Sequence, residues 1–459
     1  MIPSLIGAAA LLLEVLGIIA AAHALMHTRT PQGAIGWVLG LLLLPALTLV
    51  PYLYLGSSRF RGYLKRHRSA ALPVPPATPA NDDERRYAAL VAMLGRPFRP
   101  GHRLRLLVDG DTTFEAIFAA IAGARHTLLV QFFIFKDDGL GRRMQQALLE
   151  RAAAGVRVCV LYDGVGSHDL PRRYVETLRA GGVAIHPFAT GRWRNRLQLN
   201  FRNHRKIVVV DGERAFIGGL NVGDEYLGLK PPLAPWRDTH MELRGPAVAD
   251  LQRLFADDWE WITGATPPLH PMPAPDGAAR VLAVASGPAD PQETGSLFVT
   301  AAINAAQKRI WLTSPYFVPD HSVRAALQLA VFRGVDVRVL IPSRPDHRTV
   351  FLASTLHAYH ALRAGVRVFR YQPGFVHEKV LLVDDDCAAV GSLNLDTRSF
   401  RLNFEASALV LDRDFARQVE SMLENDFARA RAVDTREYLD APYLHRVTMH
   451  VARLFDPLL

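Results

Sequence analysis

The sequence predicts an α/β fold made of two pseudo-symmetric α/β/α halves that form one site, preceded by a hairpin of two transmembrane helices. Three observations lead to this prediction. Two long apolar runs open the chain, one order of helix-like and strand-like segments occurs twice, and one polar motif occurs twice with matched spacing. A chain of 459 residues also exceeds the usual size of a single domain.

The N-terminal region, residues 1–58, carries the two apolar runs, at about residues 3–25 and 33–56. Each run is long enough to cross the hydrocarbon core of a bilayer, which requires about 20 helical residues. A cleaved signal peptide would need a basic segment before the first run, which this sequence lacks. We therefore expect two membrane helices. Glu14 should face the second helix, because a carboxylate exposed to lipid is costly.

Basic residues beyond the second run indicate which side of the membrane holds the rest of the chain. The turn between the runs carries one cation, Arg29, whereas five follow the second run: Arg59, Arg61, Lys65, Arg66 and Arg68. The positive-inside rule then places everything after residue 57 in the cytoplasm. Residues 59–100 are interpreted as a basic juxtamembrane segment and a Pro-rich linker, and residues 264–280 as a second Pro-rich linker.

The two linkers frame two segments that resemble each other, residues 101–263 and 281–459. The stretch "AIAGARHTLLVQFFIF" at 120–135 corresponds to "AINAAQKRIWLTSPYF" at 302–317, and "LRAGGVAIHPF" corresponds to "LRAGVRVFRYQ". Short apolar strands that alternate with helical segments are typical of an α/β architecture. A two-fold duplication with a polar repeated element indicates one site at a pseudo-two-fold interface, because purely structural repeats need three or more units.

The repeated motif spans residues 204–221 in the first half and 377–394 in the second. Side chains two residues apart on a strand share one face, so the His and Lys that open each copy point the same way. Both copies hold the same residues in the same order: His204, Lys206, Asp211 and Asn221, then His377, Lys379, Asp384 and Asn394. Small residues before the asparagines, including Gly219 and Ser392, let the backbone bend back toward the site.

Two imidazoles among ammonium groups and carboxamides suit phosphodiester transfer. One imidazole can attack phosphorus and form a covalent phosphoryl-enzyme, while the other protonates the leaving alkoxide and deprotonates the incoming alcohol. The lysines and asparagines can stabilise the negative oxygens of the transition state. We assign the His, Lys and Asp of both copies to catalysis, and Asn221, Asn394, Ser392 and Gly219 to substrate binding. No HExxH motif or CxxC pair occurs, and we expect no metal or cofactor.

Each catalytic imidazole also needs an acceptor that fixes its tautomer and supports its cationic form. Asp238 lies 34 residues after His204, and Glu405 lies 28 residues after His377, at equivalent places in the two halves. We expect these carboxylates to orient the imidazoles, with crosswise pairing between the halves as one arrangement. The alternative for each is a surface or structural acid.

The net charge of +9 favours a polyanionic partner, either nucleic acid or an anionic membrane. The two membrane helices decide for lipid, and no nucleic-acid partner is expected. The Arg-rich insertion at 189–203 is either a lip facing lipid headgroups or a solvated loop, and the basic segment 444–455 is either membrane-bound or a structural helix. Two cysteines, Cys159 and Cys387, are expected to be buried free thiols.

The motif H-x-K-x4-D-x6-G-[SG]-x-N, present twice, resembles the signature of the phospholipase D superfamily. The stretches "FIGGLNVGDEYLG", "RDTHMELRGPAV", "SPYFVPD" and "RSFRLNFEAS" resemble bacterial cardiolipin synthases, as do the N-terminal apolar runs. The resemblance implies two phospholipase D-like halves. It implies transfer of a phosphatidyl group between two phosphatidylglycerol molecules with release of glycerol, without a metal and through a phosphohistidine. It also implies His204 as nucleophile and His377 as acid and base.

Several alternatives stay open at this point. Water could replace the alcohol, which would make the chain a membrane-anchored phospholipase D-type hydrolase, and a nuclease of the same superfamily is disfavoured by the membrane helices. Phosphatidylethanolamine could replace one phosphatidylglycerol. A non-catalytic membrane scaffold is disfavoured because both motifs are intact. We expect a multi-pass protein of the bacterial inner membrane with a cytoplasmic catalytic domain. The sequence leaves the oligomeric state open.

Overall fold

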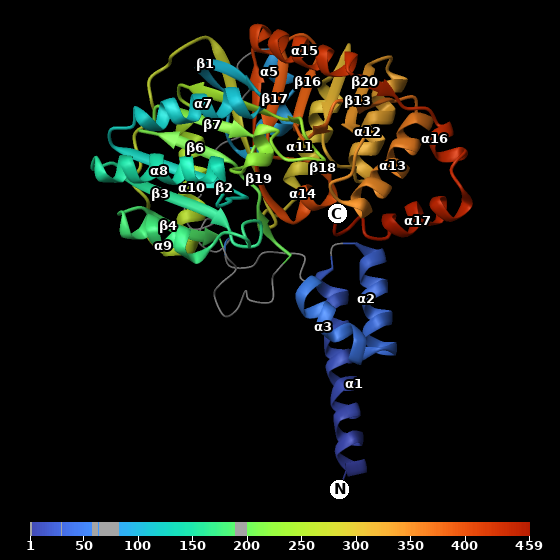
Figure 1. Cartoon of the computed structure of the whole chain (residues 1–459). Helices are drawn as coiled ribbons and strands as arrows, with labels where there is room; N and C mark the ends of the chain where they lie inside the picture. Colours follow the sequence, from blue (N-terminus) through green and yellow to red (C-terminus); the bar gives the residue numbers. More distant parts are fainter. Residues whose placement is uncertain (1, 29, 57–62, 64–81, 189–199) are drawn as a thin grey trace.

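The computed structural model describes residues 2–28, 30–56, 63, 82–188 and 200–459. Three N-terminal helices project from one side of a globular α/β body (Figure 1). The five basic residues between positions 59 and 68 and most of the insertion at 189–203 lie outside the described residues, so the predictions made for them stay predictions.

The N-terminal helices are α1 (Ile2–His27), α2 (Pro31–Leu43) and α3 (Pro45–Leu55). The predicted second membrane helix at 33–56 is therefore not confirmed. Pro45 cannot donate a hydrogen bond within a helix, and Leu44 before it leaves the helical conformation with φ −138° and ψ 57°. At about 1.5 Å per residue, α2 and α3 are each too short to cross about 30 Å of hydrocarbon.

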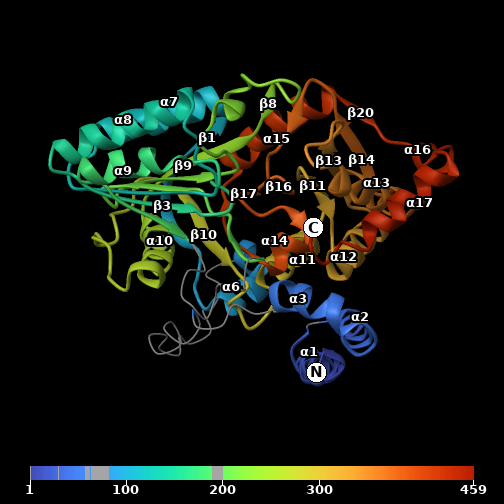
Figure 2. The same cartoon turned by 60° about the horizontal axis from the view of Figure 1, so that its bottom comes forward.

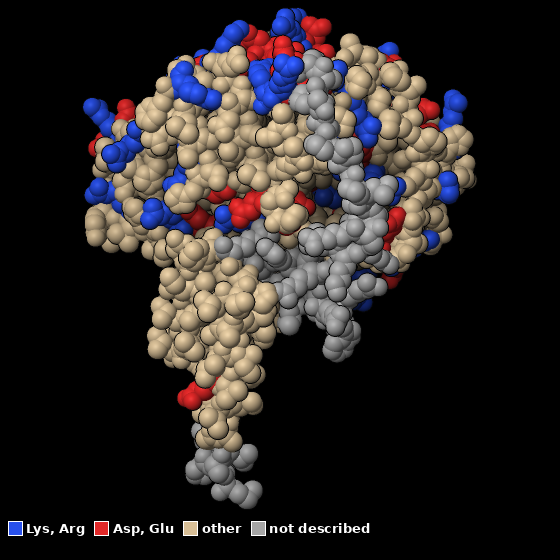
Figure 3. Space-filling view, turned by 180° about the vertical axis from the view of Figure 1, so that it is seen from behind, with Lys and Arg blue, Asp and Glu red and all other residues tan. Residues whose placement is uncertain are grey.

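The two short helices fold back on each other beside α1 (Figures 1 and 2). Thr48 of α3 donates a hydrogen bond to the Gly40 carbonyl of α2 at 2.8 Å, and Tyr52 contacts Nδ1 of His23 in α1 at 2.7 Å. Among the described residues, only α1 holds a segment long and apolar enough to span a membrane, Gly7–His27. Glu14 does not face a second spanning helix. It is exposed. Figure 3 shows that the coloured part of the N-terminal projection carries far fewer charged side chains than the body.

The globular body is built on one 16-stranded sheet that runs through both halves. The first half consists of β1 (Arg99–Val108), α7 (Asp109–Ala122), β2 (Thr127–Phe132), α8 (Gly139–Ala153), β3 (Arg157–Asp163), α9 (Arg172–Ala180), β4 (Ala184–Phe188), β5 (Arg202–Asn203), β6 (Ile207–Val210), β7 (Arg214–Gly218), the 3-10 helix η2 (Asp224–Leu227), β8 (Trp236–Arg237), β9 (Thr239–Arg244) and α10 (Val248–Thr263).

The second half repeats this order and ends in additional elements. It consists of β10 (Ala279–Ser286), α11 (Thr294–Ala305), β11 (Arg309–Thr313), β12 (Phe317–Val318), α12 (His321–Phe332), β13 (Asp336–Pro342), α13 (Arg348–Arg363), β14 (Arg367–Tyr371), β15 (Phe375–Val376), β16 (Val380–Val383), β17 (Cys387–Gly391), β18 (Leu395–Asp396), α14 (Thr397–Arg401), β19 (Asn403–Leu411), α15 (Arg413–Ala428), β20 (Ala430–Ala432), α16 (Arg436–Leu439) and α17 (Tyr443–Arg453).

The strand order shows how the halves join. It runs β20-β14-β13-β11-β16-β17-β19-β10 through the second half and β1-β9-β7-β6-β2-β3-β4 through the first. In each half three strands are parallel and the motif strand pairs antiparallel with its neighbours. The seam is the antiparallel pair β1–β10, where Arg99 lies opposite Val281. The duplicated α/β architecture predicted from the sequence is confirmed.

Helices cover both faces of the sheet. On one face α10 and α15 pack into a single apolar cluster with strands from both halves, including Phe255, Trp259, Leu423 and Phe427. On the other face α7–α9 cover the first half and α11–α12 cover the second. The shared cluster under α10 and α15 fixes the halves relative to each other. Both cysteines are free and buried, as predicted.

The predicted linker at 59–100 is partly folded. Helices α5 (Asp82–Arg85) and α6 (Ala88–Leu94) lie within it, and β1 begins at Arg99. Tyr87, Leu90, Val91 and Phe98 are buried in the core of the second half. The linker prediction relied on proline and charge. These four apolar side chains come after the Pro-rich stretch, and they extend the hydrophobic core of the second half.

Candidate active site at the junction of the halves

Each motif histidine is held through its backbone by the opposite half. His204 follows β5, which pairs parallel with β19, and its N–H donates to the Phe404 carbonyl at 2.9 Å. His377 follows β15, which pairs with β8, and its N–H donates to the Arg237 carbonyl at 2.7 Å. The residue that follows each acceptor is a carboxylate, Glu405 or Asp238.

The two carboxylates therefore meet the imidazoles crosswise. Nδ1 of His204 lies 3.0 Å from Oε2 of Glu405, and Nδ1 of His377 lies 2.7 Å from Oδ2 of Asp238. All four side chains are buried. Because a carboxylate only accepts, the ring proton sits on Nδ1, and the lone pair of Nε2 is free to act on a ligand.

The motif lysines are anchored beside the imidazoles. Nζ of Lys206 donates to the His204 carbonyl at 2.6 Å, and Nζ of Lys379 donates to the His377 carbonyl. Nζ of Lys379 also lies 3.0 Å from Nδ1 of His377. Both ammonium groups are buried. Burial of cations without a fully matched set of counter-charges favours the binding of an anion.

The electrostatics place both motifs in one site. Burial lowers the pKa of His204 and of His377 to about 4, and the carboxylate partner of each opposes that shift. Lys379 acts on His204, and Lys206 acts on His377, each lowering the pKa further. Burial also lowers the pKa of Lys379 to about 8. At neutral pH both imidazoles are thus unprotonated at Nε2 before a ligand binds.

The carboxylates stay ionised in the same environment. Burial alone would raise the pKa of Asp238, but His377 and Lys379 outweigh it, and the pKa of this carboxyl is lowered. For Glu405, burial is likewise outweighed by His204 and Lys206, with a further contribution from the Ser392 hydroxyl. Each half of the site therefore holds a neutral imidazole supported by an anion.

The difference between Gly219 and Ser392 has a steric cause. A Cβ at Gly219 would lie 2.1 Å from Oδ1 of Asp238, so no side chain fits there. At the equivalent place in the second motif, the Ser392 hydroxyl donates to Oε2 of Glu405. In the first half the backbone N–H of Thr239 donates to Oδ1 of Asp238 instead, at 2.7 Å. These contacts place Gly219 and Ser392 behind the carboxylates.

The two motif asparagines are not equivalent. Asn221 accepts from the Ile134 N–H at 3.1 Å and donates to the Tyr226 hydroxyl at 3.1 Å, so both ends of its amide are used. Asn394 is buried, and within the described part of the chain its Oδ1 has no hydrogen-bond partner. Asn394 is therefore the asparagine whose carbonyl oxygen is available to a hydrogen-bond donor on a ligand.

The motif aspartates lie away from the imidazoles. Each follows a four-residue strand, so Asp211 and Asp384 are separated from their histidines by about 20 Å of extended chain. Asp211 accepts from the N–H groups of residues 125, 126 and 127, each at 2.8 Å. Both aspartates have the left-handed φ of 52°. We interpret them as turn and strand-end caps, which differs from the catalytic role assigned from the sequence.

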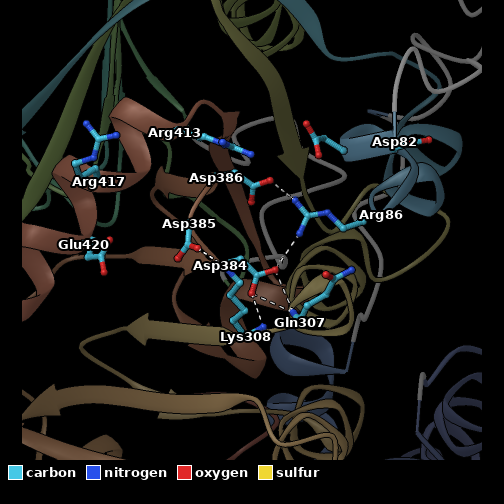
Figure 4. Close-up of a pocket in the computed structure, with 11 residues that line it drawn as sticks. Asp82, Arg86, Gln307, Lys308, Asp384, Asp385, Asp386, Arg413, Arg417 and Glu420 are labelled. Atoms are coloured by element: carbon cyan, nitrogen blue, oxygen red, sulfur yellow. Dashed lines mark hydrogen bonds and ion pairs between the residues drawn. The ribbon is translucent and has the colours of Figure 1, made fainter.

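Figure 4 shows the surroundings of Asp384, a charged cavity of about 550 Å³. Oδ1 of Asp384 accepts from the N–H groups of Gln307, Lys308 and Arg309 at 2.8 to 3.1 Å, and Oδ2 accepts from Arg86 at 2.9 Å. The cavity lining includes no residue of the two His–carboxylate pairs.

Asp384→Asn is expected to destabilise the protein without disabling the site. The amide would lose the Arg86 ion pair and turn an N–H toward backbone donors, which lowers the free energy of unfolding by about 1–3 kcal/mol. The kcat of the folded fraction should stay close to wild type. Denaturant unfolding and initial rates measured on the same sample check this. A large drop in kcat at unchanged stability would return Asp384 to the catalytic set.

Sequence reasoning missed two buried arginine–carboxylate pairs that support the histidines. Arg205 Nη1 donates to Asp258 at 2.9 Å, and its Nε donates to the Glu405 carbonyl at 3.2 Å. Arg237, the residue directly before Asp238 in the chain, donates from Nη2 to Asp426 at 2.7 Å. Both acids lie near the C-terminal ends of α10 and α15, where "DDW" corresponds to "NDF". The repeat in the sequence therefore held a signal for these two acids, because they occupy corresponding positions in the two halves.

A third buried histidine adds to the pH dependence of folding. Burial lowers the pKa of His240 to about 4, and its Nδ1 accepts from the Leu220 N–H at 3.3 Å. The unfolded chain binds protons on histidine at pH 6.5, whereas the folded chain does not until about pH 4. Stability is therefore present above pH 6.5 and is lost as the pH falls toward 4.

We expect acidification from pH 7 to 5 to cost on the order of 2 kcal/mol for each such histidine, from 1.36 kcal/mol per pKa unit. In His240→Asn the amide oxygen can still accept from Leu220, but the group no longer titrates. The loss of unfolding free energy between the two pH values should then be smaller by about that amount. Equal losses in the variant and the wild type would contradict the assignment.

The walls around the imidazoles are aromatic. The Phe133 ring packs edge-on against His204 with centroids 4.9 Å apart, and the Trp236 ring lies 5.0 Å from that of His377. The site holds two neutral imidazoles, two buried lysines and the unpartnered Oδ1 of Asn394, next to aromatic rings. This set of groups suits covalent transfer at phosphorus. The fold and the site together define a phospholipase D-type phosphotransfer enzyme.

Comparison with known proteins gives the more specific assignment. The family described as "Cardiolipin synthase, PLD-like domain" matches residues 117–259 and 299–427. Cardiolipin synthase A of Pseudomonas aeruginosa is 57% identical over 97% of this chain and 95% of its own length. The enzyme of that name from Pseudomonas putida is 56% identical, over 98% of this chain and 97% of its own length. The chain belongs to the cardiolipin synthase family.

Solved structures support the fold alone. A phosphatidylserine synthase from Haemophilus influenzae matches with a TM-score of 0.62 at 14% identity, covering 83% of this chain and all of that chain. A polyphosphate kinase from Porphyromonas gingivalis matches with a TM-score of 0.51 at 16% identity, covering 72% of this chain and 49% of that one.

Proposed function

We propose that this phosphatidyltransferase moves a phosphatidyl group from one phosphatidylglycerol to a second, giving cardiolipin and glycerol. The observation that carries the proposal is the crosswise pairing of His204 with Glu405 and His377 with Asp238 in one buried site. Identity of 57% to a cardiolipin synthase over nearly the whole chain supports the choice of substrate.

The first step forms a phosphohistidine. Nε2 of His204 attacks phosphorus, a P–N bond forms, and the P–O bond to the terminal glycerol breaks. His377 gives the proton that the glycerol alkoxide needs. His377 is unprotonated in the free enzyme, and the negative charge of the bound phosphodiester, next to Asp238, raises its pKa so that it enters the step as imidazolium.

The second step restores the enzyme. His377, now neutral, takes the proton from a glycerol hydroxyl of the second phosphatidylglycerol. The hydroxyl oxygen attacks phosphorus, the P–N bond to His204 breaks, and cardiolipin leaves. Lys206 and Lys379 stabilise the negative oxygens of both transition states, and the unpartnered Oδ1 of Asn394 can accept a hydrogen bond from a substrate hydroxyl. We assign Asn221 a supporting role here, because Tyr226 and Ile134 already occupy its amide.

The protein is membrane-associated, as its family membership implies, and we propose the bacterial inner membrane as its site. Helix α1 is the proposed anchor, and the cytoplasm is the proposed compartment of the body, on the basis of the basic residues at 59–68. A tethered site acts on lipids in place, which avoids exposing acyl chains to water at about 0.8 kcal/mol per CH₂.

A lipid-product assay tests the proposed function. The purified full chain, reconstituted with phosphatidylglycerol as the only substrate lipid, should yield cardiolipin and glycerol in equal amounts by mass spectrometry. Phosphatidic acid as the main product would mean that water is the acceptor and the enzyme is a hydrolase. Cardiolipin that forms only when phosphatidylethanolamine is added, with ethanolamine released, would overturn the assignment of phosphatidylglycerol as the phosphatidyl donor. His204→Ala is the control for contaminating activity.

A further inference from the structure

The C-terminal helix α17 has two apolar faces. At 100° per residue, Met449 and Ala452 lie on one face, and both are buried. Ala452 packs into a cluster with Ala353 of α13 and Val318 of β12. The sequence left segment 444–455 as either membrane-bound or a structural helix. The buried face shows that α17 packs as a structural helix of the second half.

The other apolar face of α17 has no covering element in the described structure. Its side chains fall within about 120° of the helix circumference and extend two residues past the helix end. They are 39% to 76% exposed and comprise Tyr443, Leu444, Val447, Val451, Leu454 and Phe455. Scattered apolar side chains are common on protein surfaces, but a contiguous exposed apolar stripe often marks a binding surface.

The exposed stripe has a basic flank. Arg446, His450 and Arg453 occupy the sector of the helix next to it, and α17 contains no acidic residue. A basic polar face beside a compact apolar stripe is the pattern of a helix that lies in the headgroup region of an anionic bilayer. A protein groove would not require this bias toward cations.

The position of α17 in the fold points to the same partner. In Figure 1 it lies along the lower edge of the body, the edge from which α1–α3 project. Figure 2, which brings that lower side forward, shows α17 in front of the body. Helix α17 and the membrane anchor therefore lie on one side of the molecule.

The chain beyond α17 is tied to the second motif. The backbone carbonyl of Leu459 accepts from the Arg398 N–H at 2.6 Å, and the Leu458 carbonyl accepts from its guanidinium at 2.7 Å. Arg398 lies in α14, which follows the motif asparagine, Asn394, through β18. These hydrogen bonds connect the segment after α17 to the helix that follows the second motif.

We propose that the exposed face of α17 rests in the headgroup region of an anionic bilayer. With α1, it gives the body a second contact and sets the orientation of the active site toward its lipid substrates. The inference concerns binding, and it holds whichever acceptor the enzyme uses.

Site-specific fluorescence tests this proposal on the full chain. Both native cysteines are buried, so a cysteine introduced by Val451→Cys takes a maleimide dye selectively. The matched control is Ser421→Cys on α15, an exposed position on the side of the body opposite the anchor (Figure 1). Both are made with His204→Ala, so that vesicles of phosphatidylglycerol and phosphatidylcholine keep their composition.

Nitroxide-labelled lipid should quench most of the emission at position 451 and little at 421, while iodide in the water should do the reverse. Equal quenching by iodide at both positions would overturn the proposal. So would protection of position 451 from both quenchers, because a second copy of the chain would then be covering the face. Equal lipid quenching at both positions would show non-specific adsorption and would also overturn it.

A charge variant gives a second readout with catalysis intact. Val447→Glu and Val451→Glu change exposed positions only, so the fold and the site should be retained. The rate on phosphatidylglycerol vesicles should fall severalfold, and the rate on a short-chain, water-soluble phosphatidylglycerol should not change. Unchanged rates on both substrates would contradict a membrane-docking role.

Discussion

A His377→Ala variant should release one equivalent of nitrophenolate from a phosphatidyl ester of p-nitrophenol and then stop, whereas His204→Ala should release none. Nitrophenolate leaves without a proton, so the first step no longer needs the acid, but the second step still needs a base for the incoming hydroxyl. On phosphatidylglycerol both variants should lose on the order of 10⁴-fold or more in kcat. This expectation rests on the orientation of the two rings. Glu405 and Asp238 each bind Nδ1 of one imidazole, which leaves its Nε2 for the substrate.

Stopped-flow absorbance measures the burst of nitrophenolate. Intact-protein mass spectrometry of the His377→Ala variant detects the phosphatidyl adduct expected on His204. The double variant His204→Ala/His377→Ala is the matched control and should show neither. A burst from His204→Ala with none from His377→Ala would exchange the two roles. The absence of a burst in both would exclude a phosphohistidine as the intermediate.

Glu405→Gln should reduce kcat by about 10³- to 10⁴-fold with little change in KM. The glutamine amide can donate to Nδ1 of His204, which moves the ring proton to Nε2 and removes the attacking lone pair. The loss of the buried anion also destabilises the cationic imidazole that forms at phosphorus. Asp238→Asn should act in the same way on His377.

Ser392→Ala is the matched control for Glu405→Gln. It removes a hydrogen bond to the same carboxylate and leaves the charge in place, so its effect on kcat should be far smaller. Near-wild-type turnover in Glu405→Gln would reduce the carboxylate to a structural acid. The nitrophenyl ester separates the two acids further. Asp238→Asn should retain its burst on that substrate, and Glu405→Gln should lose it.

The duplicated motif made the central part of this site predictable. Strand periodicity puts each His and Lys on one face, and the common order of segments in the two halves identifies Asp238 and Glu405 as equivalent positions. Pairing across the halves could not be derived in the same way. It depends on β5 joining β19 and β15 joining β8, and strands of two residues give no signal in a sequence.

Other features escaped sequence reasoning for local reasons. Average apolarity over residues 33–56 predicts one helix, but one proline at position 45 divides the run in two. Asp211 and Asp384 share the motif with the catalytic residues, and spacing alone cannot separate a strand cap from a catalytic acid. Arg237 and Asp426 are far apart in the chain, and only the fold brings them together.

The exchange of carboxylates across the seam has a consequence for how the enzyme can change over generations. A mutation at position 405 damages the imidazole of the other repeat, and a mutation at 238 does the reciprocal harm, so neither repeat can degenerate while its sister carries on alone. An ancestor with a single repeat would have had to borrow its acid from a neighbouring molecule. Two such genes, once fused, would be held under joint selection.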